Sequence, residues 1–223
     1  ILRPYQFCNL SEVICRAEDT VATLKEKIRL ATILGTFQST LTDFGYLRKR
    51  WKDTTEEERL LGVSLTGIMD CPAVYNAKPE TLQELRNIAV KTNKKLAERL
   101  GIKQSAAVTC VKPSGTVSQL VDAASGIHAR HNPFYVRTVR GDNKDPLTMF
   151  LKDKGVPAEP DFTAPDSVTV FSFPMKSPEG AVCRYDMSAI EQLELWLKIA
   201  DNYCEHKPSV TISVKEHEWL AVG

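Results

Sequence analysis

The stretch VTCVKPSGTVSQLVDAASG (residues 108–126) decides the fold class. It opens with an apolar run that ends at Val111 and lacks the polar alternation of a half-exposed strand. Such a run is typical of a parallel strand that is covered on both faces. Lys112 and Pro113 then turn the chain, and VSQLVDAA reads as the start of a helix. A buried strand that leads through a short turn into a helix indicates an α/β fold with βαβ crossovers.

Three other stretches repeat their apolar residues every three or four positions, which is typical of amphipathic helices. They span residues 20–36, 81–100 and 188–204. Thr81 and Ser188 each precede a helical run, so we expect them to be N-caps.

Short apolar runs of strand length lie between these helices. They span residues 59–67, 106–111, 134–139, 167–173 and 209–214. Their alternation with helices predicts parallel strands joined by crossover helices. The turn-rich segments 140–146 and 155–167 are expected to be surface connections, because regular patterns resume directly after them. Residues 1–223 are therefore predicted to form a single domain.

Composition and charge argue against two classes of partner. The net charge is +1, and no basic stripe runs through the chain, so we expect no nucleic-acid partner. The densest basic stretch, LRKRWK (47–52), is followed at once by DTTEEER, which favours a solvated charged loop. No run of 18 apolar residues and no signal-peptide pattern occurs, so we expect a cytoplasmic protein without a membrane partner. The start at Ile1 favours a piece of a longer chain.

The six cysteines form no CxxC pair, and their spacing fits neither a zinc ribbon nor a disulfide scaffold. A reducing compartment is therefore expected. Cys8, in RPYQFCNLSEV (3–13), is compatible with two roles: a buried structural thiol or half of a redox pair. His128 and His131 are spaced i, i+3, but Gly126 and Pro133 make helical geometry doubtful there. We expect a polar loop and no metal site.

The turn after Val111 carries the most suggestive chemistry. The start of a helix presents unpaired N–H groups that attract an anion, and Gly115 would let a ligand approach the backbone closely. The hydroxyls of Ser114, Thr116 and Ser118 could also bind phosphate oxygens. The turn matches neither GxxxxGK[ST] nor GxGxxG. An ordinary turn with Ser or Thr as the N-cap stays an open alternative.

Four segments, in order along nearly the whole chain, resemble the large catalytic chain of ribonucleotide reductases. The closest resemblance is to the adenosylcobalamin-dependent class, specifically the monomeric ribonucleoside-triphosphate reductase type. The segments are FCNLSEV (7–13), ERLLGVSLTGIMD (58–70), VKPSGTVSQLVDAASGIHARHNPFYVRTVR (111–140) and EHKPSVTISV (205–214). KPSGT followed by SGIHARH is the most specific feature.

The resemblance implies that the chain is the C-terminal half of a ten-stranded α/β barrel, with the N-terminal half and a C-terminal tail elsewhere. It implies reduction of ribonucleotides to 2′-deoxyribonucleotides by thiyl-radical chemistry, with adenosylcobalamin as cofactor and a thioredoxin-like dithiol as reductant. The full-length protein is expected to be a monomer, and the isolated piece is expected to be inactive.

The resemblance also assigns residues. Cys8 matches one member of the reducing cysteine pair, whereas the radical cysteine, its glutamate and the other pair member are expected before Ile1. The loop that binds the substrate's phosphates would consist of Pro113, Ser114, Gly115, Thr116, Val117 and Ser118. The other five cysteines, at positions 15, 71, 110, 183 and 204, are expected to be structural thiols.

Two alternatives to this interpretation remain. The first is another reductase of the same superfamily, the large subunit of a metal-cofactor (class I) ribonucleoside-diphosphate reductase. The glycyl-radical class of reductases belongs to this superfamily too and has the same barrel. The second is a non-catalytic α/β module that binds phosphate through KPSGT and in which Cys8 only packs.

Overall fold

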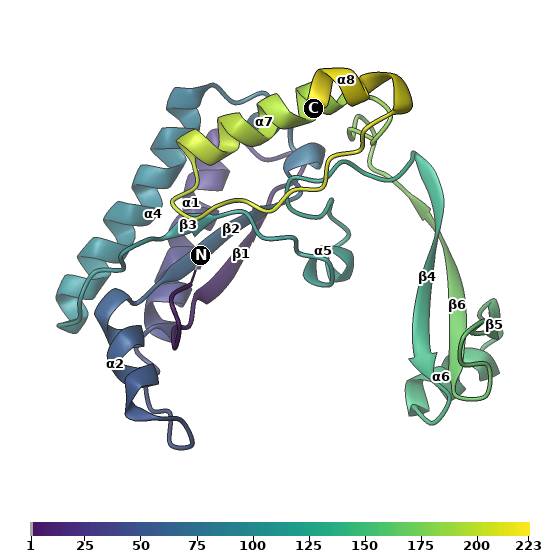
Figure 1. Ribbon diagram of the computed structural model, residues 1–223, viewed down its shortest axis with the longest axis horizontal. Helices are drawn as coiled ribbons and strands as arrows, with labels where there is room; N and C mark the ends of the chain where they lie inside the picture. Colours follow the sequence, from purple (N-terminus) through teal and green to yellow (C-terminus); the bar gives the residue numbers. More distant parts are fainter. Residues whose placement is uncertain (1) are drawn as a thin grey trace. The chain divides into compact units, whose positions relative to one another are not determined.

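The computed structural model describes residues 2–223, which divide into two compact units (Figure 1). The larger unit runs up to Arg130 and resumes at Gly180–Gly223, and the smaller unit is His131–Glu179. The single domain expected from the sequence stays a prediction. No helix in the described residues combines the length and the apolar character needed to cross a membrane.

The larger unit is built on a parallel sheet of three strands in the order β1-β2-β3. The strands are β1 (Asn9–Ile14), β2 (Leu61–Thr66) and β3 (Thr109–Cys110). Helix α1 (Val21–Gln38) and helix α2 (Lys49–Glu58) lie between β1 and β2 in the chain, and α4 (Pro79–Leu100) lies between β2 and β3. The predicted α/β architecture of parallel strands joined by crossover helices is confirmed.

The core of this unit lies between the sheet and the helices. Every residue of β2 is buried, and Leu61, Val63 and Leu65 belong to the same cluster as Leu24 and Ile28 of α1. Because successive side chains of a strand point to opposite faces, the even-numbered residues of β2 point away from this core. The sheet therefore has one face covered by helices and a second face, here called the open face.

The helices confirm two of the three expected starts and correct one. α1 covers the predicted 20–36, and α7 (Ala189–Asn202) begins at Ser188, whose side chain accepts from the Glu191 amide in a capping box. Thr81 is not an N-cap. α4 begins earlier, with Lys78 as its N-cap and Pro79 in the first turn. Proline is tolerated there because the N–H groups of the first turn have no acceptor within the helix.

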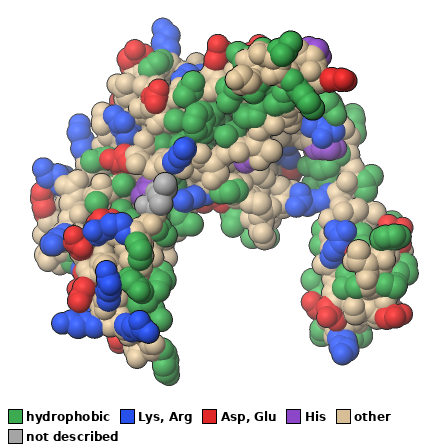
Figure 2. All heavy atoms as spheres, viewed as in Figure 1, with side chains coloured by type: hydrophobic (Ala, Val, Ile, Leu, Met, Phe, Trp, Pro, Cys, Tyr) green, Lys and Arg blue, Asp and Glu red, His purple; other side chains and the backbone are tan. Residues whose placement is uncertain are grey.

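Most of the charged stretch expected to be a loop is the helix α2, Lys49–Glu58, so that expectation was wrong. α2 is exposed along most of its length, and only Thr55 is buried. Figure 2 shows basic and acidic side chains intermingled over it. Its residues are mostly good helix formers, and charges on a solvated face do not oppose a helix.

Four short elements and one irregular segment also belong to the larger unit. After β2 come a 3₁₀ turn, η1 (Ile68–Asp70), and α3 (Pro72–Tyr75), and η2 (Glu216–Glu218) and α8 (Trp219–Val222) end the chain. The expected strand at 209–214 does not form. Ser209 donates its amide to the Val111 carbonyl at 3.0 Å, but no ladder follows, because the Ser213 amide donates to the Gln192 side chain instead.

The smaller unit is an antiparallel sheet in the order β4-β6-β5. Its strands are β4 (Phe134–Asp142), β6 (Val168–Lys176) and β5 (Ala158–Pro160), with α6 (Pro146–Asp153) between β4 and β5. The runs 134–139 and 167–173 are strands as predicted, but they are antiparallel to each other, so the parallel arrangement expected for them was wrong. Parts of both expected surface connections, 140–142 and 158–160, belong to strands as well.

One buried carboxylate fixes the turn between β5 and β6. Asp161 accepts from the Thr163 hydroxyl at 2.6 Å and from Arg140 Nε at 2.7 Å. These bonds to the charged form, led by the one from Thr163, hold the pKa of Asp161 well below its usual range.

Candidate active site

The open face of the sheet brings together two thiols that are 102 positions apart in the chain. Cys8 immediately precedes β1 and is half-buried, and Cys110 ends β3 and is buried. Gly62 of β2 lies between them. A Cβ placed on Gly62 would lie 3.2 Å from the sulfur of Cys8 and 3.2 Å from the sulfur of Cys110. The two side chains therefore converge over the position of β2 that has no side chain.

Both thiols are held in the neutral form. Burial raises the pKa of Cys8, and the nearby charge of Lys112 offsets part of that rise. Burial raises the pKa of Cys110 to about 12. Lys112, which directly precedes the predicted phosphate loop, is thus close enough to influence both thiols.

The loop after Lys112 presents backbone amides to solvent. Lys112 itself is anchored, because its amide donates to the Ser64 hydroxyl at 2.9 Å. Pro113, Gly115, Thr116 and Val117 are exposed. In the described part of the chain the amides of Gly115, Thr116 and Val117 have no hydrogen-bond partner.

The three hydroxyls of the loop have different surroundings. Thr116 is the residue before the short helix α5 (Val117–Leu120), but its side chain makes no capping bond. The Ser114 hydroxyl is buried and, within residues 2–223, has no partner. The Ser118 hydroxyl is turned inward, donates to the Ser114 carbonyl and lies 2.8 Å from the Ser125 hydroxyl. In this conformation Ser118 stabilises the loop and does not reach outward, and the simple capped turn is not what the structure shows.

A buried ion pair that sequence reasoning missed holds the segment that follows the loop, at Asp122 and Ala124. Arg130 donates to both carboxylate oxygens of Asp70, at 3.0 and 2.8 Å, and both side chains are almost fully buried, with exposed fractions of 4% and 5%. Asp70 also accepts from the Ala124 amide at 2.7 Å. Arg130 reaches Asp122 as well. The only sequence signal was the position of Asp70 and Arg130 inside the family-like segments 58–70 and 111–140.

The histidines take separate roles. His128 Nδ1 lies 2.8 Å from the Ser125 carbonyl and Nε2 lies 3.2 Å from the Thr211 hydroxyl, so this ring ties the segment after the loop to the C-terminal segment. His131 belongs to the smaller unit. His206 bonds the Leu61 carbonyl at 2.9 Å, and burial lowers its pKa. Among the described residues no three His, Cys, Asp or Glu side chains are grouped as metal ligands.

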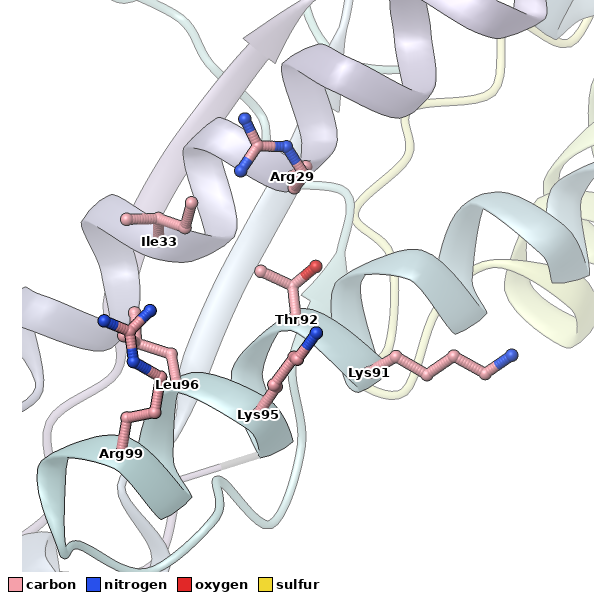
Figure 3. Close-up of a pocket in the computed structure, with 7 residues that line it drawn as sticks. All are labelled: Arg29, Ile33, Lys91, Thr92, Lys95, Leu96 and Arg99. Atoms are coloured by element: carbon pink, nitrogen blue, oxygen red, sulfur yellow. The ribbon is translucent and has the colours of Figure 1, made fainter.

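A cleft of about 370 Å³ lies elsewhere, between α1 and α4 (Figure 3). It is lined by Arg29, Ile33, Lys91, Thr92, Lys95, Leu96 and Arg99. Its four basic residues are exposed, Arg29 is paired with Glu26, and Figure 3 shows Lys91 pointing away from Arg29. Since α1 and α4 cover the other face of the sheet, this cleft is separate from Cys8 and the loop.

Comparison with known proteins gives a consistent result. No family model matches the chain. The chain is 27% identical over 218 residues to an adenosylcobalamin-dependent ribonucleoside-triphosphate reductase of Euglena gracilis, which covers 95% of this chain and 29% of that protein. It is 28% identical over 198 residues to the Lactobacillus acidophilus protein of the same name, with 76% and 26% covered. The expected resemblance is confirmed.

The fold comparison agrees. A crystal structure of a B12-dependent (class II) ribonucleotide reductase matches 99% of this chain and 35% of that one, with a TM-score of 0.77 and 20% identity. The predicted fold class is thereby confirmed for the part of the reductase fold that these residues represent. The chain spans less than a third of the length of the curated reductases described above.

Proposed function

We propose that this chain is the part of an adenosylcobalamin-dependent ribonucleotide reductase that supplies one redox cysteine, Cys8, and the loop that binds the substrate's phosphates. The observation that carries the proposal is the shared open face. Lys112, the residue before the loop, donates its amide to the Ser64 hydroxyl, and Ser64 is on the same face of β2 as Gly62, over which the Cys8 sulfur lies. The similarity to ribonucleoside-triphosphate reductases over 95% of the chain supports the substrate class.

The loop suits a polyphosphate through its backbone. Three neighbouring amides, those of Gly115, Thr116 and Val117, have no partner in the described residues, and oriented amides of this kind form anion-binding concavities. The buried Ser114 hydroxyl without a partner would gain one from a phosphate oxygen. Ser118 would act indirectly, by holding the Ser114 carbonyl.

Cys8 would deliver electrons as one of two thiols. A cysteine outside this chain would carry the thiyl radical that removes the 3′ hydrogen. Cys8 and a second cysteine, also outside this chain, would then become a disulfide, while the 2′-hydroxyl leaves as water and C2′ receives hydrogen. A thioredoxin-like dithiol would restore both thiols by exchange. We propose a monomeric, cytoplasmic full-length enzyme.

Adenosylcobalamin would supply the radical in the full-length protein. The groups assigned here are amides, hydroxyls and thiols, which fit a phosphate and a dithiol exchange.

Two substitutions in the full-length protein test the proposal. Cys8→Ser should abolish repeated turnover with a dithiol carrier, whereas Cys204→Ser, at another half-buried thiol, should not. Cycling that survives Cys8→Ser removes this residue from the reducing pair. Turnover that does not need adenosylcobalamin would favour the metal-cofactor class. The isolated 223-residue chain should show no reductase turnover.

A test substitution and a matched control examine the loop. Nothing lies within 4 Å of a Cβ added at Gly115 or at Gly45, so alanine at either position is compatible with the fold. Gly115→Ala should raise the KM for the ribonucleotide, because the methyl group occupies the path of the phosphate. Gly45→Ala should leave KM unchanged. Equal effects of the two changes would argue against the loop as the phosphate site.

A further inference from the structure

The two thiols over Gly62 have a geometry that the reductase role does not require. Their sulfurs both lie 3.2 Å from the Cβ position of Gly62, so they are separated by no more than the sum of these two distances. The Leu10 side chain also fills the space above Gly62. Leu10 is half-exposed, whereas Cys110 is fully buried.

This pair is poorly placed for a disulfide. Cys8 lies just before β1 and Cys110 ends β3, and these two strands flank β2. Their Cα atoms are therefore roughly 9–10 Å apart or more, which is two strand spacings. A disulfide needs Cα atoms within about 7 Å of each other. The sulfurs nevertheless point at one spot, so a single atom placed between them could bond to both.

We propose that Cys8 and Cys110 form a two-thiolate binding site for a soft monovalent cation, with Cu⁺ as the ion it would take. Thiolates are the side-chain ligands that favour Cu⁺. Zn²⁺ normally takes four ligands, and the described residues provide no group of three or more here. On binding, both S–H protons leave and two metal–sulfur bonds form, with no change in oxidation state.

The charge of the surroundings suits a Cu⁺ ion bound by two thiolates. Two thiolates and one monovalent cation carry a net charge of −1, which is costly to bury without a counter-charge. The Lys112 ammonium acts on both Cys8 and Cys110 and would supply that charge. The ion would reach the half-buried Cys8 first and then Cys110, as Leu10 moves aside.

Gly62 is the positioning residue of this site. An alanine there would place its methyl group 3.2 Å from each sulfur, in the space that the ion must occupy. Leu10 would have to rotate away, which is possible because its side chain is half-exposed. The two thiols would remain, but the space between them would be lost.

The test is an anaerobic titration of the purified chain with Cu⁺, in competition with bathocuproine disulfonate, followed by iodoacetamide labelling and mass spectrometry. We expect one ion per chain, with Cys8 and Cys110 protected together and two protons released. Cys8→Ser and Cys110→Ser should each weaken binding by more than the roughly 100-fold that changes around a metal site cause. Cys183→Ser and Cys71→Ser, the controls, should bind as the wild type does.

Gly62→Ala keeps the proposal testable if Cys110→Ser fails to fold, and circular dichroism checks the fold of each variant. Gly62→Ala should weaken Cu⁺ binding about tenfold, within the range for changes next to a metal site, while both cysteines still react with iodoacetamide. Protection of other cysteines, free labelling of Cys110 in the loaded protein, or unchanged affinity in Gly62→Ala would overturn the proposal. None of these readouts needs turnover, so the site and the reductase function can fail separately.

Discussion

The buried pair between Asp70 and Arg130 gives the sharpest prediction about what stabilises the segment after the phosphate loop. The two side chains have exposed fractions of 5% and 4%, and Asp70 also accepts from the Ala124 amide. Removing the carboxylate takes away the acceptor of two hydrogen bonds from the buried Arg130 guanidinium. Breaking a buried pair from one side costs about 3–5 kcal/mol. We therefore expect Asp70→Ala to lower the free energy of unfolding by this amount.

The matched control removes the other carboxylate. Asp122 is 60% exposed, so its ion pair with Arg130 contributes about 1 kcal/mol or less. Its backbone has φ +47°, a conformation that asparagine tolerates. Asp122→Asn should therefore change stability by no more than about 1 kcal/mol.

Urea denaturation followed by tryptophan fluorescence measures both changes. All three tryptophans, Trp51, Trp196 and Trp219, lie in the larger unit, so the signal reports the unit that contains the pair. A loss in Asp70→Ala no larger than that in Asp122→Asn would refute the reasoning, because it would show that the buried charge on Arg130 needs no partner. In the full-length enzyme, Asp70→Ala should also raise the KM for substrate, since Asp70 holds Ala124 and the neighbouring Ala123 amide donates to the Ser118 carbonyl at the end of the loop.

Three further changes have defined outcomes. Lys112→Gln removes a charge that lowers the pKa of Cys8, so alkylation of Cys8 by iodoacetamide at a fixed, mildly alkaline pH should slow; an unchanged rate would contradict this. Hydrogen bonds from a threonine hydroxyl and an arginine hold the pKa of Asp161 low, so Asp161→Asn should destabilise the smaller unit at neutral pH. That difference should shrink as the pH falls below about 3.9, the value for an unfolded Asp, and hydrogen exchange of β4 and β6 against pH measures it. Ser188→Ala removes an N-cap bond and should cost about 1 kcal/mol in urea denaturation, whereas Thr81→Ala, inside α4, should cost little.

Helices could be predicted from the sequence better than strand partners, and the reason is physical. A helix buries one face through contacts between residues three and four apart, so its pattern lies within a short window. α1 and α7 were located in this way. The N-cap at Thr81 was misplaced, because the apolar repeat begins inside α4, while its start depends on Pro79.

Strand direction is not contained in a short window. The runs 134–139 and 167–173 form strands, but they pair antiparallel with each other, and an apolar run has no feature that specifies its neighbour. The run 209–214 has the composition of a strand and forms none. Within this run, the Ser209 amide donates to the Val111 carbonyl just after β3, and no regular set of strand hydrogen bonds follows. Composition alone cannot show that these further bonds are missing.

The candidate site shows the same division between local and distant information. KPSGT could be recognised as an anion loop because a turn and its amides are local. The inward rotation of Ser118 could not, since it depends on Ser114 and Ser125. Convergence of Cys8 and Cys110 depends on the register of three strands and on a glycine in the middle one.

Gly62 had no distinctive signal in the sequence, because a glycine in a buried strand reads as a weak point or a bulge. The role of Gly62 follows from its two neighbours across the sheet, the thiols of Cys8 and Cys110. An alanine at this position would separate two thiols that the backbone brings together from opposite sides of β2. Cys110, expected to be only structural, therefore becomes a second sulfur beside the proposed redox cysteine. If the Cu⁺ titration protects both, a metal ion can withdraw Cys8 from dithiol exchange without touching the substrate loop.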